Sequence, residues 1–344
     1  MINENKKILF ESIIIFILTL TFNLICNEVT LDEIWNYGFS YNIANGLIPY
    51  KDFNMIITPF FSILGSIFML IFGKNLLIYN IFNAIICVII YFFIKKQTPK
   101  YYLIVYSLLL FISLPNYSLF CLLLLYIIIN KDKGKSNDYL IGILLGLTFL
   151  TKQNIGIFLC VPTLFAKDIK KILKRIFGFI IPTIFFLIYL LYTNTLYSFI
   201  DYTLLGMNNF IENNTSINKG YIAIFFITSI YLISSYIKNK DIKLIYLLCF
   251  QGMAIPIFDS YHTILAFVPV FGEMLNKIKI PKNIPINKFI SIGFITYVTT
   301  ILLLSIYSLS NTNTFLNDSD LLKYKRVNNN LLKEQDDLDG NGCK

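Results

Sequence analysis

Long apolar blocks alternate with short polar or basic stretches along most of the chain. Each block runs for roughly 12 to 21 residues, and a bilayer core of about 30 Å needs roughly 20 residues of helix. The pattern therefore predicts an all-α polytopic membrane protein with about 11 (9–13) transmembrane helices. The apolar blocks cover residues 8–26, 55–72, 76–94, 101–114, 117–129, 139–150, 155–166, 176–192, 221–237, 242–257, 263–275 and 289–309.

The composition supports a membrane location. The chain is 56% hydrophobic and only 14% charged, with a mean hydropathy of +0.67. An average soluble domain carries roughly 25% charged residues, because a soluble fold must cover itself with polar groups. We expect a multi-pass protein of the cell membrane. No small-residue cleavage site follows the first block, so we expect an uncleaved first helix.

Basic clusters between the blocks predict the topology. Lys6 and Lys7, with the clusters at 131–135, 167–175, 238–243 and 277–288, are typical of cytoplasmic loops. The net charge of +9 therefore indicates topology and contact with anionic lipid, and we expect no nucleic-acid partner. When the spans are counted from these cytoplasmic loops, Lys95, Lys96 and Lys100 fall on the outer side, against the positive-inside rule.

We expect one membrane domain over residues 1–310 and a polar extracytoplasmic tail over 311–344. Outer loops are predicted at about 27–54 and 193–220. In the first of these loops, Thr30 and Glu33 have capping-box spacing, and apolar or aromatic residues recur at helical spacing up to Gly46. A short amphipathic helix at the outer interface is therefore predicted.

Carboxylates gather in this first loop. Glu33 is explained by its capping role, whereas Asp32 has no such role and sits where the helix N-terminus favours its ionised form. Asp32 suits a general base or a metal ligand, and Asp52 adds a further carboxylate on the same face. The alternative is an ordinary solvated loop.

Two more polar groups interrupt the apolar pattern. Lys152, Gln153 and Asn154 form a cation with two amides that could bind a lipid-linked phosphate; the alternative is a snorkelling lysine. Nearby, Gly142 and Gly146 are spaced for close helix packing.

His262 is the only histidine of the chain. It could ligate a metal or donate to phosphate, and Asp259 shares that interpretation. A lone histidine is more often structural, so that alternative stays open.

Several short motifs together resemble those of the GT-C superfamily of membrane glycosyltransferases, of the protein O-mannosyltransferase and aminoarabinose transferase type. The resemblance covers roughly residues 1–310, and the acidic first loop is its most specific part. The motifs are Asp32-Glu33, Ala44-Asn45-Gly46, Pro49-Tyr50-Lys51-Asp52-Phe53, Pro59, Phe72-Gly73-Lys74-Asn75, Thr151-Lys152-Gln153-Asn154 and Tyr261-His262.

The resemblance implies a transferase that moves a sugar from a polyprenyl-phosphate donor to a glycan, lipid or protein acceptor at the extracytoplasmic face. Asp32 would be the general base and Glu33 would contact the acceptor or a metal. A divalent cation, Mg²⁺ or Mn²⁺, is implied, with Asp32 and His262 as candidate ligands. The implied substrate-binding residues are Tyr50, Asp52, Lys152, Gln153, Asn154, Tyr261 and His262.

Two other classes of function stay open. A transporter or flippase for lipid-linked saccharides would need ionisable groups along its path, whereas those of this chain gather at one face. An inactive relative that binds lipid-linked sugar is the third class. Gly-rich phosphate loops and His-Glu-x-x-His motifs are absent from the sequence.

Overall fold

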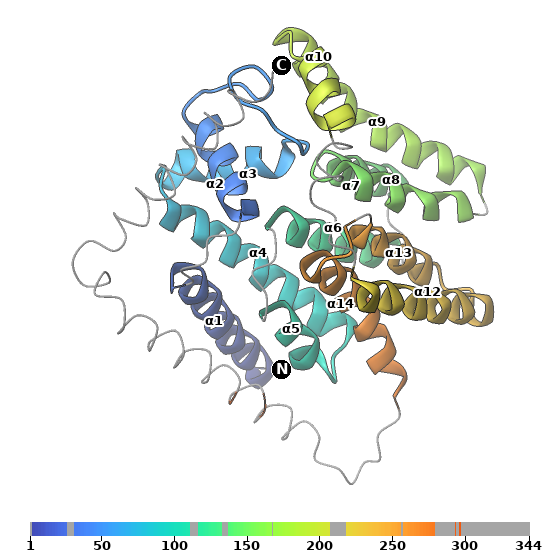
Figure 1. The fold of residues 1–344 in the computed structure, drawn as a ribbon. Coiled ribbons are helices and arrows are strands. Elements are labelled where there is room, and N and C mark those ends of the chain that lie inside the picture. Colours follow the sequence, from blue (N-terminus) through green and yellow to red (C-terminus); the bar gives the residue numbers. More distant parts are fainter. Residues whose placement is uncertain are drawn as a thin grey trace. The chain divides into compact units, whose positions relative to one another are not determined.

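The computed structural model describes residues 2–25, 31–110, 116–132, 137–166, 168–206, 218–255 and 257–278, together with Gly293 and Thr296. Within these residues the chain is helical and contains no strand, as predicted for an all-α protein (Figure 1). The predicted block at 289–309 and the tail at 311–344 lie outside the described residues, apart from the two isolated positions.

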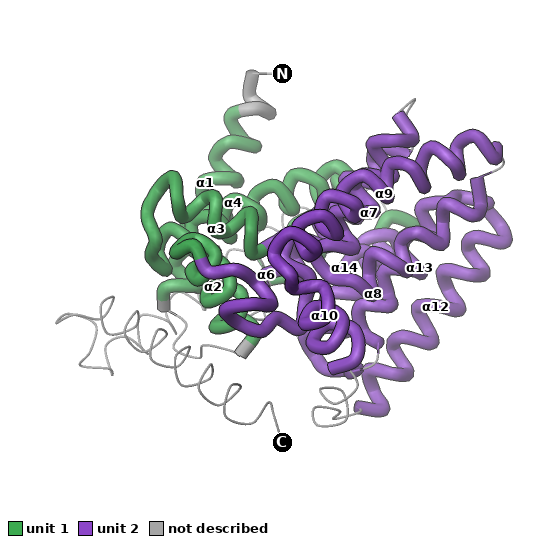
Figure 2. Tube along the Cα trace, turned by 90° about the horizontal axis from the view of Figure 1, so that it is seen from above, with its two compact units in different colours: residues 1–46, 62–111, 276–344 green, residues 47–61, 112–275 purple. Residues whose placement is uncertain are grey.

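The chain divides into two compact units, which are coloured separately in Figure 2. Unit 1 comprises residues 1–46, 62–111 and 276–344, and unit 2 comprises residues 47–61 and 112–275. The described residues of both units fall within the stretch 1–310, for which the sequence predicts one membrane domain.

Unit 1 contains the first five helices of the chain. The first and fourth helices pack side by side in opposite directions, and a polar cluster around Glu11 of the first helix fixes them. Lys95 Nζ of the fourth helix lies 2.5 Å from Glu11 Oε2, and Tyr102 of the fifth helix donates to Glu11 Oε1 at 2.7 Å. Tyr91 donates to the same carboxylate. The helices are α1 (Ile2–Ile25), α2 (Leu31–Ala44), α3 (Phe60–Phe72), α4 (Leu76–Gln97) and α5 (Tyr102–Leu110).

This cluster corrects one part of the predicted topology. Lys7 also lies 3.9 Å from Glu11, so Lys95 belongs to the same end of unit 1 as the basic N-terminus, and not to the opposite side. The reason is that the block at 55–72 was counted as a full span. Its helix α3 has only 13 residues, which is about 20 Å at 1.5 Å per residue.

Unit 2 contains the remaining helices. Several of them are short. The elements are α6 (Asn116–Asp132), α7 (Asp138–Phe149), α8 (Gln153–Cys160), η1 (Val161–Phe165), α9 (Ile169–Tyr192), α10 (Leu196–Phe199), the π-helical η2 (Ile200–Leu205), α12 (Lys219–Asn239), α13 (Ile242–Phe250), η3 (Gln251–Ala254) and α14 (Ser260–Lys277).

Four described helices are long and apolar enough to cross a membrane, rather than about eleven. They lie within α1, α4, α9 and α12, and this result fits a helical membrane protein. The predicted count was wrong because apolar character does not fix helix length. The helices formed at 138–149 and 242–250 have 12 and 9 residues and reach only about 18 and 14 Å.

The outer surfaces of α9 and α12 are apolar. Phe185 and Leu191 on α9 are 69% and 55% exposed, and Ile227 and Ile230 on α12 are 64% and 66% exposed. Large contiguous apolar surfaces are rare on soluble monomers, so lipid is the solvent that suits these helices.

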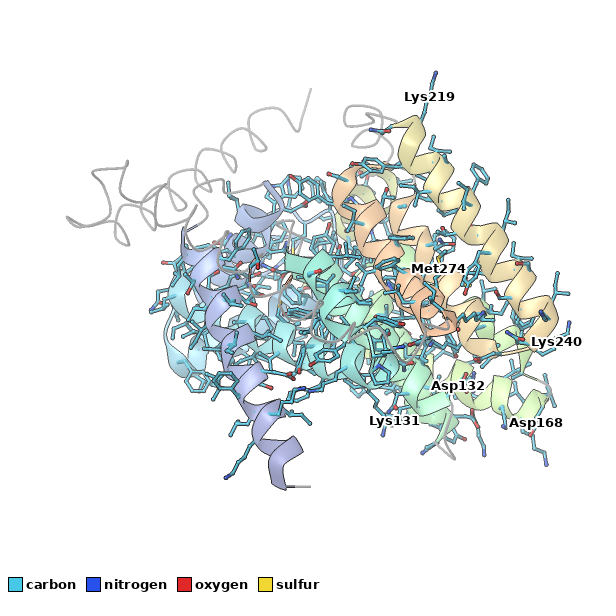
Figure 3. The ribbon with its side chains drawn as sticks, turned by 90° about the horizontal axis from the view of Figure 1, so that it is seen from below. Lys131, Asp132, Asp168, Lys219, Lys240 and Met274 are labelled. Atoms are coloured by element: carbon cyan, nitrogen blue, oxygen red, sulfur yellow. The ribbon has the colours of Figure 1, made fainter. Side chains whose placement is uncertain are left out.

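The two ends of unit 2 differ in chemistry. At one end Arg175 of α9 binds Asp132 at the end of α6 and, at 3.0 Å, Asp138 at the start of α7. Lys243 of α13 lies 2.6 Å from Glu273 of α14. This ion pair belongs to the same end of unit 2, since Tyr246, one turn after Lys243, accepts a hydrogen bond from Arg175. Figure 3 shows Lys131, Asp132 and Asp168 toward this end and Lys219 toward the other.

Glycines let α7 and α9 pack with their backbones in contact. A Cβ on Gly142 would lie 2.1 Å from the Arg175 carbonyl oxygen, and one on Gly178 would lie 2.2 Å from the Tyr139 carbonyl oxygen. A Cβ on Gly146 would lie 2.5 Å from Pro182 Cγ. The predicted role of Gly142 and Gly146 in helix packing is confirmed.

Replacement of Gly142 by alanine is expected to lower the stability of unit 2 by about 1–3 kcal/mol, because the new methyl group overlaps a backbone carbonyl that cannot rotate away. Thermal unfolding of the purified protein in detergent measures the effect. Gly220→Ala is the matched control, since its Cβ would lie 3.2 Å from the Asn218 side chain at an exposed helix start. Equal melting temperatures for the two variants would contradict the packing argument.

Candidate functional site

The predicted site residues divide between the two units. Asp32 and Glu33 belong to α2 of unit 1, and the other seven belong to unit 2. Within unit 2 these seven come from three places in the chain: the segment at 47–61, the start of α8 and the start of α14.

The helix predicted in the first loop is present as α2, and its C-terminal stop is confirmed. Gly46 has a φ of +88°, the left-handed conformation that glycine adopts readily after a helix. One face of α2 is buried, since Tyr37 is 2% exposed and Ser40 is fully buried, and the placement at the membrane surface stays a prediction. A Cβ on Gly65 of α3 would lie 2.6 Å from Ser40 Oγ, so α2 packs tightly on its neighbour.

Asp32 lies in the first turn of α2 and is partly exposed. Its backbone carbonyl oxygen accepts a hydrogen bond from Asn36 Nδ2 at 2.6 Å. Thr30 and the side chain of Glu33 lie outside the described residues, so the capping box and the role of Glu33 stay predictions.

Asp52 and Tyr50 hold a turn in unit 2. Asp52 is exposed, and its carboxylate accepts a hydrogen bond from the Ile48 backbone N–H at 2.7 Å. Tyr50 has a φ of +68° and is 3% exposed, and its hydroxyl donates to the Ile57 carbonyl oxygen at 2.8 Å. Burial raises the pKa of Tyr50 well above its usual range, and a hydrogen bond with Thr203 opposes this only in part. These contacts give both residues a structural role.

The segment that follows this turn closes the end of α7. Thr58 Oγ1 donates to the Phe149 carbonyl oxygen at 2.9 Å, and the Phe60 N–H donates to the Leu150 carbonyl oxygen at 2.9 Å. Both acceptors belong to the last turn of α7, whose carbonyl groups have no partner within the helix. The irregular backbone at 55–60 thus lies against the tip of α7.

Gln153 joins the same segment to η2. Its Nε2 donates to the Ile56 carbonyl oxygen at 3.2 Å and to the Thr203 carbonyl oxygen at 3.3 Å. Thr203 Oγ1 in turn donates to the Met55 carbonyl oxygen at 3.1 Å. Asn154, by contrast, makes a local contact, since its Oδ1 accepts from the Ile155 N–H at 2.9 Å.

Lys152 lies at the turn between α7 and α8 and is only 9% exposed. Its ammonium group lies 3.5 Å from Ser118 Oγ, 3.2 Å from the Met253 sulfur and 5.1 Å from the centre of the Tyr117 ring. These partners come from the start of α6 and from η3, so three elements of unit 2 meet at one cation. The prediction of an exposed snorkelling lysine is excluded by this burial.

Asp259 and His262 interact with each other at the start of α14. Asp259 caps α14, because its Oδ1 accepts from the His262 backbone N–H at 2.7 Å. Both carboxylate oxygens also lie 2.9 Å from His262 Nδ1. Burial raises the pKa of Asp259, but the hydrogen bonds from His262 and the nearby charge of Lys152 outweigh it, so the pKa lies below its ordinary value.

The structure therefore brings together one cation, one carboxylate and one imidazole, which we define as the Lys152–Asp259–His262 cluster. Lys152 and His262 are buried and Asp259 is half-buried, and all three lie at the end of unit 2 opposite the Arg175 ion pairs. The i, i+3 spacing of Asp259 and His262 was visible in the sequence. Ser118, Met253 and Thr203 were missed, because their contacts join positions far apart in the chain and ordinary hydrophobic or hydroxyl residues carry no local signal.

The predicted metal site finds no support in this geometry. Among the described residues, no three His, Cys, Asp or Glu side chains lie close enough together to hold a metal ion. Nδ1 of His262 is engaged by Asp259. A metal held by Asp32 and His262 therefore stays a prediction.

Comparison with known protein families, with characterised proteins and with solved structures gives no match to this chain. The resemblance to the GT-C superfamily therefore stays a prediction. The cluster has to be interpreted from its own chemistry.

The lowered pKa of Asp259 predicts an acid-dependent contribution to stability. The carboxylate stabilises the folded protein above pH 3.8, its ordinary value, and this contribution is lost as the pH falls through the lower folded pKa. Asp259→Asn should therefore lower the melting temperature at pH 6 and change it less at pH values below the lowered folded pKa, where the wild-type carboxylate is itself protonated. Asp241→Asn, which alters a helix cap with no histidine, is the control. If the difference in melting temperature between Asp259→Asn and the wild type were the same at every pH, the stabilising role of the ionised Asp259 carboxylate would be contradicted.

Proposed function

We propose that this chain is a membrane transferase that moves a sugar from a polyprenyl-phosphate donor to an acceptor at the extracytoplasmic face. The observation that carries the proposal is the burial of Lys152 with Asp259 and His262 at one end of a lipid-facing helical unit. A buried ammonium in an apolar bundle is costly, and its retention is typical of an anion-binding or catalytic site.

The chemistry of such a donor matches the cluster. When the bond between the anomeric carbon and the phosphate breaks, negative charge develops on the departing phosphate. Lys152 supplies a cation in a water-poor environment, where its interaction with phosphate is strong. The exposed apolar surfaces of α9 and α12 suit a substrate that stays in the bilayer by its hydrocarbon tail.

The orientation also supports the proposal. The basic residues of unit 2 gather around the Arg175 end, which the positive-inside rule assigns to the cytoplasm. The Lys152–Asp259–His262 cluster lies at the opposite end, where lipid-linked sugars and acceptors would meet. The resemblance assigns the general base to Asp32 of α2, and that assignment is kept here as part of the proposal.

A second candidate is a transporter for lipid-linked saccharides. One observation favours it: α7 and α8 are short helices of 12 and 8 residues, and the turn between them carries Lys152 beside Met253 of η3. Interrupted helices that meet around charged groups are common at transporter binding sites.

Purified protein in lipid vesicles, supplied with radiolabelled polyprenyl-phosphate sugars and a mixture of glycan acceptors, separates the two candidates. A transferase is expected to move label from lipid to acceptor, and Lys152→Gln should reduce the rate by about 10²-fold or more, since it removes a transition-state charge contact. Lys152→Arg, which keeps the charge, should retain more activity. Label that changes leaflet without leaving the lipid would favour the transporter and contradict the transferase.

The same assay tests the base. Asp32→Asn is expected to reduce transfer by about 10²–10⁴-fold while lipid binding is retained, because only proton transfer is lost. Asp168→Asn is the control, since Asp168 caps α9 through the Lys170 N–H and the amide oxygen of asparagine can accept the same hydrogen bond. Transfer by Asp32→Asn at the wild-type rate would exclude Asp32 as the base.

A further inference from the structure

The imidazole of His262 is held from one side only. Nδ1 lies 2.9 Å from both oxygens of Asp259. Among the residues that the structure describes, Nε2 has no hydrogen-bond partner, although the side chain is only 10% exposed. Nε2 is not fully buried, so this ring nitrogen can meet a proton donor from a substrate.

Asp259 determines which nitrogen is available. An ionised carboxylate can only accept hydrogen bonds, so the neutral ring places its proton on Nδ1 and leaves the lone pair on Nε2. The low pKa of Asp259 keeps the carboxylate ionised at neutral pH. The same arrangement of carboxylate, imidazole and outward-facing Nε2 serves as the base in hydrolases with a Ser-His-Asp triad.

We propose that Asp259 and His262 form a proton-transfer dyad in which Nε2 of His262 removes the proton from the acceptor hydroxyl. The inference rests on the transferase proposed above and differs from it in the base. The resemblance assigns that role to Asp32, whereas the contacts within unit 2 assign it to His262, so the Asp32→Asn and His262→Gln variants decide between the two residues. His262 is then a catalytic residue, and Asp259 is a positioning residue that acts through it.

The step balances as follows. The hydroxyl oxygen of the acceptor forms a bond to the anomeric carbon while the bond from that carbon to the phosphate oxygen breaks. The electron pair of the broken bond leaves with the phosphate, and the hydroxyl proton moves to Nε2. The imidazolium that results is paired with the Asp259 carboxylate, and Lys152 is the nearby cation for the departing phosphate.

Because His262 is the only histidine, its ring can be observed alone. Protein that carries ¹⁵N-labelled histidine is measured by NMR in detergent micelles at alkaline pH. The expected spectrum is that of the Nδ1–H tautomer, with Nε2 unprotonated. An Nε2–H tautomer in the wild-type protein would overturn the dyad, whatever the activity.

Asp259→Asn separates the dyad from the helix cap. Asparagine caps helices as well as aspartate does, so α14 should keep its start. The amide nitrogen, however, is a donor that faces Nδ1, so the ring is expected to change to the Nε2–H tautomer. Asp168→Asn is the matched control, because Asp168 caps α9 through the Lys170 N–H at 2.9 Å and should leave the histidine spectrum unchanged.

Sugar transfer completes the test. Asp259→Asn and His262→Gln are each expected to slow transfer by about 10²–10⁴-fold, and the two changes together by no more than either alone, since they act in one step. Transfer by His262→Gln at the wild-type rate would overturn the inference and leave the base to Asp32. Absence of transfer in wild-type protein that shows the Nδ1–H tautomer would count against the transferase itself, and not against the geometry of the dyad.

Discussion

The backbone contact between α7 and α9 is the constraint on which unit 2 depends. Glycines on both helices remove the side chains that would separate them, and Arg175 anchors the contact by binding the end of α6 and the start of α7. Arg175 is 5% exposed, and removing one partner of such a buried pair typically costs about 3–5 kcal/mol. Close packing and a satisfied charge thus fix the base from which α7 projects.

The length of α7 determines where Lys152 and its covering segment lie. The helix ends after 12 residues, so Lys152 lies at its tip and is buried by protein. Thr58 and the Phe60 N–H bind carbonyl groups that the end of α7 leaves without partners, and Gln153 holds the same segment through the Ile56 carbonyl oxygen. A short helix, a buried cation and an irregular covering segment are therefore parts of one arrangement.

The sequence predicted the helical class, the end of α2, the glycine packing and the polar character of the Lys152 and His262 positions. It could not predict the span count, because hydropathy reports which residues avoid water and not where a helix stops. The contact of Lys152 with Met253 joins residues that share no local pattern, so only the folded chain reveals it. The Asp259–His262 pair was accessible because a helix cap and an i, i+3 contact are both local.

The unequal lengths of the helices have a consequence for the surrounding bilayer. α9 and α12 have 24 and 21 residues and apolar outer faces, so these helices respond to hydrophobic mismatch. α6 and α13 are buried along much of their length and are matched to protein neighbours instead. A thicker or thinner membrane would thus change the tilt of the lipid-facing helices, whereas the depth of the Lys152–Asp259–His262 cluster within unit 2 is set by protein packing alone.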